Sequence, residues 1–102
     1  MRKTISRISY NNSNYSFTRN GHRFIVSQNW KNKYSEETQS EKRHYTNPLD
    51  ALAHYRILMN VRSETLLEKG MAEDAILFQV EKSKAEKYVA NLTTHATQEI
   101  EG

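Results

Sequence analysis

The stretch that decides the fold is YSFTRNGHRFIV, residues Tyr15 to Val26. Its centre, Asn20-Gly21, is typical of a two-residue hairpin turn of type I′, because both central residues of that turn need positive φ. Such a turn sets the cross-strand pairs: Arg19 with His22, Phe17 with Phe24, and Tyr15 with Val26. These side chains share one face, and the alternate residues are mostly polar, as in a half-buried antiparallel sheet.

The segments on either side of this hairpin extend the sheet. Residues Thr4 to Tyr10 are rich in β-branched side chains and predict a strand, and Asn11 to Asn14 predict a turn. Residues Asn29 to Ser40 are polar and show no periodicity, so they predict a long exposed loop. Glu41 to Tyr45 predict a short further strand. The first part of the chain therefore predicts an antiparallel sheet of three or four strands.

A helix start follows at Asn47-Pro48-Leu49-Asp50. Asn47 can cap the helix, proline suits the first helical position, and an acidic residue is favourable in the first turn. Apolar residues and good helix formers continue from Leu49 to Val61. The pattern predicts a long helix that runs on through Leu66 and Leu67 and stops at Gly70, a natural residue after a helix C-cap.

Residues 75–81 fit two structures. The run from Ala75 to Val80 is consistent with a strand or with the middle of a helix. Ser83 and Glu86 have the spacing of a capping box, which favours a strand before Ser83 and a helix from Lys84 to about Thr94. The alternative is one continuous helix from Ala72. The polar tail, about 95–102, is expected to fray.

Size and composition predict one domain of the α+β class. The chain has 102 residues, of which 36% are hydrophobic and 10% aromatic. We expect a basic β-rich part (1–46) packed against a helical, mildly acidic part (47–102). The absence of cysteine excludes disulfides, and no apolar run approaches the length of a membrane span. No secretory signal is evident, so we expect a cytoplasmic protein with no membrane contact.

The charge is unevenly distributed along the chain. Residues 1–34 carry seven basic side chains and no acidic one, whereas residues 46–102 carry six basic and nine acidic side chains. Lys and Arg contact phosphates, and aromatic rings among them can stack on bases. The competing interpretation is a basic face that is merely solvated. The candidate contacts to nucleic acid or to an acidic protein are Arg2, Lys3, Arg7, Arg23, Trp30, Lys31, Lys33 and Tyr34.

Enzymatic and metal-binding patterns are missing. The three glycines form no phosphate-binding loop, no G-x-S-x-G is present, and the four histidines lack the paired spacing of zinc sites. We therefore expect a non-enzymatic protein that needs no cofactor and no metal.

A cluster of apolar residues in the second half is expected to belong to the core; if part of it stays exposed, it would bind a protein or a second copy of the chain. Its members are Leu66, Leu67, Ile76, Leu77, Phe78 and Val80.

The order of strands followed by the helix that opens with YTNPLDALA resembles the sheet-reading DNA-binding domains of plant transcription factors and of integrase arms, over residues 4–62 and in topology alone. This resemblance and the charge predict contact with DNA or RNA through the basic sheet and loop. The chain also resembles, in type, the small accessory proteins of phages and mobile elements. That resemblance implies the alternative: inhibition or modulation of a host nucleic-acid-processing or defence complex by stoichiometric protein binding.

Overall fold

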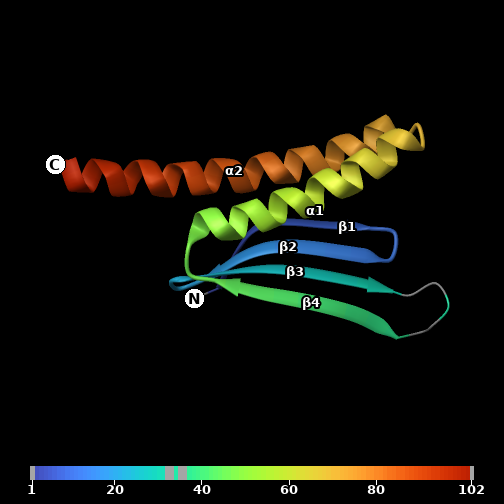
Figure 1. Cartoon of the computed structure of the whole chain (residues 1–102), viewed down its shortest axis with the longest axis horizontal. Helices are drawn as coiled ribbons and strands as arrows, with labels where there is room; N and C mark the ends of the chain where they lie inside the picture. Colours follow the sequence, from blue (N-terminus) through green and yellow to red (C-terminus); the bar gives the residue numbers. More distant parts are fainter. Residues whose placement is uncertain (1, 32–33, 35–36, 102) are drawn as a thin grey trace.

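The chain forms a four-stranded antiparallel meander followed by two long helices (Figure 1). The computed structural model describes residues 2–31, 34 and 37–101, with side chains through Thr93. The elements are β1 (Arg2–Tyr10), β2 (Ser13–Asn20), β3 (Arg23–Lys31), β4 (Thr38–Tyr45), α1 (Pro48–Glu68) and α2 (Ala72–Glu101). The predicted α+β class is confirmed. Within the described residues, neither helix is long and apolar enough to cross a membrane.

The central hairpin forms where the sequence predicts it, but its register differs. Phe17 pairs with Val26 and Arg19 with Phe24, so the two central residues of the turn are Gly21 and His22. Gly21 has φ of 65°, and His22 is not among the described residues with positive φ. A glycine at the first central position fits a type II′ turn. The predicted type I′ register is therefore wrong by two residues, although the same side chains share each face.

The third and fourth strands are longer than the sequence predicts. β3 continues to Lys31, and β4 begins at Thr38 rather than at Glu41. Residues 27–31 pair with residues 38–42 and so satisfy their backbone hydrogen bonds within the sheet. The predicted loop over Asn29 to Ser40 is thus wrong at both ends. Trp30 and Lys31 belong to a strand.

A β-bulge at Ile5 interrupts β1. Thr4 pairs with Thr18, but Ser6 pairs with Phe17, so Ile5 is the extra residue. A bulge changes which side the following residues face. It turns Ser6 toward the helices and leaves Arg7 on the opposite side.

Helix α1 begins and ends where the sequence predicts. The Asn47 side chain accepts a hydrogen bond from the backbone N–H of Leu49, and Pro48 is the first helical residue. At the other end, Gly70 (φ 75°) donates to the carbonyl of Leu67, and Met71 donates to that of Leu66. This pair of bonds is a Schellman motif, which needs a residue with positive φ at the glycine position.

Helix α2 is continuous, so the favoured strand over 75–80 is wrong and the alternative is correct. Glu86, the second residue of the predicted capping box, instead binds Arg56 of α1 through its carboxylate. Helical spacing also places Ala75 and Phe78 together in the core. The frayed tail stays a prediction: the backbone is helical through Glu101, and the side chains beyond Thr93 and all of Gly102 lie outside the described residues.

The core lies between the helices and one face of the sheet. Phe17 is fully buried, with its ring 5.4 Å from that of Tyr55 on α1, and the Tyr15 ring lies 5.9 Å from that of Phe78 on α2. The predicted burial of Tyr15, Phe17 and Phe24 is confirmed. The apolar cluster predicted in the second half of the chain is only partly buried. Leu66 and Phe78 belong to the core, as expected. Four of its side chains are exposed instead: Leu67, Ile76, Leu77 and Val80.

A network of hydrogen bonds and one ion pair connects α2 to β1 at the bulge. The Ser6 hydroxyl lies 2.7 Å from the hydroxyl of Tyr55 and donates to Oε1 of Glu81 at 3.1 Å. The backbone N–H of Arg7 donates to the same carboxylate oxygen, and Lys84 forms an ion pair with Glu81. Burial raises the pKa of Tyr55 to about 12. The network therefore joins both helices to the edge strand that carries Arg7.

We expect this network to make stability depend on pH through Glu81. Burial raises the pKa of its carboxyl, but hydrogen bonds from Lys84, the Arg7 N–H and Ser6 outweigh that effect and lower it overall. A carboxyl with a lowered pKa in the folded state stabilises above its unfolded pKa, and this contribution is lost as pH falls through the folded value. The stability difference between wild type and Glu81→Gln should therefore be constant above the pKa of the unfolded carboxyl and should shrink as the pH falls below it. Urea midpoints at several pH values measure it, and a difference that stays constant below that pKa would contradict the prediction.

Candidate nucleic-acid interface

One face of the sheet carries no helix. Residues paired across antiparallel strands share a face, and the pairs that include Phe17 and Val26 face the helices. The alternate residues form what we call the outward face. Its members are Arg2, Thr4, Arg7 and Ser9 of β1; Asn14, Ser16, Thr18 and Asn20 of β2; Arg23, Ile25, Ser27, Asn29 and Lys31 of β3; and Thr38, Ser40, Lys42 and His44 of β4.

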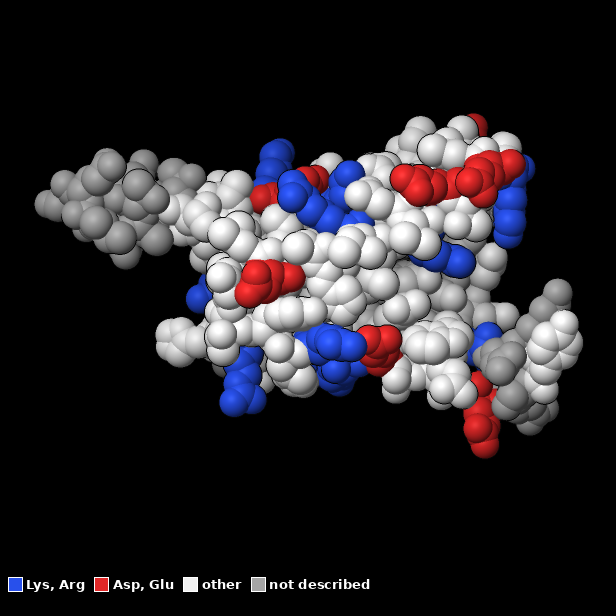
Figure 2. Space-filling view, viewed as in Figure 1, with Lys and Arg blue, Asp and Glu red and all other residues white. Residues whose placement is uncertain are grey.

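The outward face is positively charged. It holds the cations Arg2, Arg7, Arg23, Lys31 and Lys42. Glu41 is the only carboxylate in the four strands as the structure describes them, and it lies on the opposite side, paired in register with Gln28. The helix side, in contrast, mixes acidic and basic side chains (Figure 2). The charge asymmetry of the sequence thus becomes an asymmetry between two faces.

The cations flank a neutral centre. One row across the sheet holds Arg7, Ser16, Ser27 and Lys42, and the next holds Ser9, Asn14, Asn29 and Ser40. In the first row the charged residues lie on the outer strands, β1 and β4, with two serines between them. Because neighbouring strands lie about 4.8 Å apart, these two outer strands are about 14 Å apart. The face therefore offers positive charge at two sides and hydrogen-bonding groups between them.

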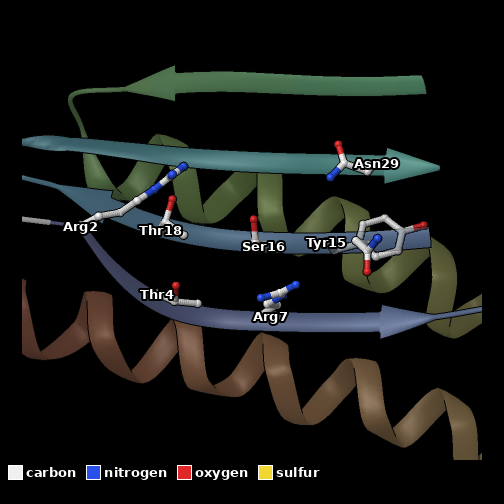
Figure 3. A pocket seen from close by; sticks show the side chains of 8 residues that line it. Arg2, Thr4, Arg7, Tyr15, Ser16, Thr18 and Asn29 are labelled. Atoms are coloured by element: carbon white, nitrogen blue, oxygen red, sulfur yellow. The ribbon is translucent and has the colours of Figure 1, made fainter. Parts of the chain in front are cut away.

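A hollow of about 270 Å³ opens on the outward face over β1 and β2. Most of the side chains that line it project away from the helices, whereas the Tyr15 ring packs against Phe78 of α2 (Figure 3). They include Arg2 and Arg7 of β1, Ser16 and Thr18 of β2, and Asn29 of β3. We refer to it as the outward hollow. Its lining supplies two guanidinium groups, hydroxyls and amides, which are groups that hold an anion.

Three polar side chains of the outward hollow, those of Arg2, Arg7 and Thr18, have no side-chain partner among the described residues. Within the described part of the chain, no side-chain hydrogen bond or ion pair engages the guanidinium groups of Arg2 and Arg7. Thr18 is 6% exposed, and its Oγ1 has no hydrogen-bond partner. A buried hydroxyl without a partner costs free energy.

The residues predicted as contacts are divided among several surfaces. Four of them share the outward face: Arg2, Arg7, Arg23 and Lys31. Lys3 and Trp30 point to the helix side of the sheet, since they pair with Arg19 and with Gln39. Tyr34 lies between β3 and β4 and is 91% exposed. Lys33 lies outside the described residues. The predicted aromatic residues and the cations of the sheet therefore do not lie on one face.

Sequence reasoning missed several members of the interface. Lys42 lies in β4, a strand that the sequence placed only in part. The hydroxyl and amide side chains of the outward face were interpreted simply as polar alternation. The signal that identifies them is the period of two, because every second residue from Asn14 to Asn20 is polar. Only the strand pairing brings Lys42 into line with Arg7.

No group of three or more His, Cys, Asp or Glu that could hold a metal occurs among the described residues. His54 of α1 lies 3.0 Å from the hydroxyl of Tyr45, and burial lowers its pKa. What the outward face offers chemically is anion binding.

Comparison of the chain with protein-family models, curated proteins and solved structures finds no match.

Proposed function

We propose that the protein is a non-enzymatic, cytoplasmic nucleic-acid-binding domain, and that the outward face contacts double-stranded DNA. The observation that carries the proposal is the set of five Lys and Arg side chains on a sheet face that holds no carboxylate among the described residues. Phosphate contacts by Lys and Arg supply most of the affinity of such proteins.

The composition of the outward face favours a duplex over a single strand. Sheets that bind single strands stack the bases on exposed aromatic rings. The outward face, in the strands described, has no Phe, Tyr or Trp, since those of the sheet point to the helices. Its serine, threonine and asparagine side chains suit hydrogen bonds to base edges and to phosphates.

The spacing of the strands favours DNA over RNA. The major groove of B-DNA is about 12 Å wide and admits two strands of a sheet, whereas that of an RNA duplex is deep and narrow. β2 and β3, which carry Ser16, Ser27, Asn14 and Asn29, would enter the groove. Arg7 and Lys42, on the strands at either side, would reach phosphates that border it.

Binding to duplex DNA should fall steeply with salt. We expect a slope of log K against log salt of about −3 to −5, because about 0.9 units are contributed by each phosphate contact and the face has five cations. Fluorescence anisotropy with a 20-base-pair DNA duplex, the matching RNA duplex and each single DNA strand would measure it. The DNA duplex should bind most tightly. Absence of binding to all four probes at about 50 mM salt would rule out the proposed function.

A protein-binding accessory role is the second candidate. The observation that favours it is a set of exposed apolar side chains on the helix pair: Ile57 and Val61 of α1, and Ile76, Leu77 and Val80 of α2. Exposed apolar patches are typical of surfaces that bind proteins. A salt-independent complex with a protein, together with no binding to any nucleic-acid probe, would favour this function instead.

A further inference from the structure

A second hollow lies at the edge of the sheet, between the β2–β3 turn and helix α2. It measures about 680 Å³ and is lined by Arg2, Lys3, Thr4, Arg19, Gly21 and Tyr88. We call it the edge hollow. Its lining contains three cations and one aromatic ring and no carboxylate. It adjoins the outward hollow, because Arg2 and Thr4 line both.

Arg19 is held in place without being neutralised. Its Nε donates to the carbonyl of Gly21 at 2.9 Å, and its Nη1 donates to the hydroxyl of Tyr88 at 2.9 Å. The guanidinium also lies 5.5 Å from the centre of the Phe24 ring. All three partners are neutral, whereas Arg43 and Arg56 pair with glutamates. The fold therefore orients a guanidinium and leaves its charge available.

Lys3 adds a second charge at the same place. Its Nζ lies 5.1 Å from the centre of the Tyr88 ring, a cation–π contact. Lys3 and Arg19 are also direct cross-strand partners in the β1–β2 register. Like charges directly opposite each other on a sheet destabilise it. Two oriented cations that have no carboxylate partner among the described side chains are the arrangement that an anion would stabilise.

We propose that the edge hollow binds a phosphate of the same DNA strand whose backbone Arg7 contacts at the border of the groove. This inference rests on the proposed function. Arg2 stands between the two hollows, so the backbone passes around the β1 edge and reaches Lys3 and Arg19. Arg19 contributes the oriented guanidinium and Lys3 the second charge, while Tyr88 is a positioning residue that holds Arg19.

The test compares three variants of the full chain on the 20-base-pair duplex. Lys3→Gln with Arg19→Gln should reduce the salt slope by about two units, one for each lost phosphate contact. Lys69→Gln, just after the end of α1, with Lys87→Gln on α2 removes the same charge from exposed positions and should leave the slope unchanged. Tyr88→Phe keeps the charge but loses the bond to Arg19, so its affinity should lie between wild type and the first variant. Circular dichroism and the melting temperature establish that each variant is folded; if the double variant is not, Arg19→Lys tests the oriented guanidinium alone and should weaken binding.

A second measurement tests the edge hollow without DNA. Inorganic phosphate, titrated at constant ionic strength, should shift the NMR signal of Arg19 Nε–H in the wild-type protein but not the backbone signals near Lys69. No shift would overturn the inference. A shift without any change of slope in the double variant would also overturn it, because the hollow would then bind a free anion and not the DNA backbone. If wild type binds no DNA at all, the proposed function fails, and the inference fails with it.

Discussion

Replacing Phe17 with alanine should lower the free energy of unfolding by about 3–5 kcal/mol. Phe17 is fully buried at the centre of the sheet, and its ring contacts those of Phe24 and Tyr55. Removing it leaves a cavity between the sheet and α1 that a close-packed core closes only in part. Because the free energy of unfolding of small domains is about 5–15 kcal/mol, this single substitution would remove a large part of it.

Urea unfolding followed by far-UV circular dichroism would measure the loss. The control is Ile76→Ala, which removes an aliphatic side chain that is 58% exposed on α2. A substitution at such a site should change the free energy of unfolding by at most about 0.5 kcal/mol. Equal effects of the two variants would show that the core does not lie where the helices meet the sheet.

Replacing three cations of the outward face with glutamine should weaken duplex binding by about a hundredfold or more at 0.1 M salt. The variant combines Arg7→Gln, Arg23→Gln and Lys42→Gln, which lie on three different strands and are all exposed. Each lost phosphate contact removes about 0.9 units of slope, which is roughly an eightfold loss at that salt concentration. The salt slope should therefore fall by about 2.7 units.

The matched control separates local contact from net charge. Arg43→Gln, Lys69→Gln and Lys87→Gln remove the same three charges from the other side of the molecule. Arg43 is the most informative of the three control positions, because it directly follows Lys42 in β4 but points to the opposite side of the sheet. If both triple variants lose affinity equally, the protein attracts DNA through its overall charge and the outward face has no special role.

The faces of the hairpin could be predicted from the sequence, but its register could not. Registers that differ by two residues bury the same side chains, so the alternation of Tyr15 and Phe17 with polar residues is identical in both. Only the turn type distinguishes the two registers. The pair Asn20-Gly21 is compatible with glycine at either the first or the second central position of the turn. The observed register places the Arg19 guanidinium against the Phe24 ring, a contact that no local pattern encodes.

The errors in the second half have a different cause. The spacing of Ser83 and Glu86 is a local signal, and it is overridden by tertiary contacts: Glu86 binds Arg56 thirty residues earlier in the chain. In the same way, Trp30 and Lys31 lack a strand pattern of their own and join β3 because residues 38–39 pair with them. The basic character of the candidate site was evident from composition. Which residues form the site could not be predicted from composition, because three strand registers together place Arg7, Ser16, Ser27 and Lys42 in one row.

The extra residue in β1 decides which surface each of its cations serves. In an uninterrupted strand, residues five apart point in opposite directions, so Arg2 and Arg7 would be separated by the sheet. With Ile5 inserted, both point outward, while Lys3 points toward Tyr88 on the other side. One nine-residue strand thus supplies charge to both hollows. The number of residues in β1 therefore decides where its charges lie. Deletion of the uncharged residue Ile5 would exchange the sides of Arg2 and Lys3 relative to Arg7 and leave the protein's net charge unaltered.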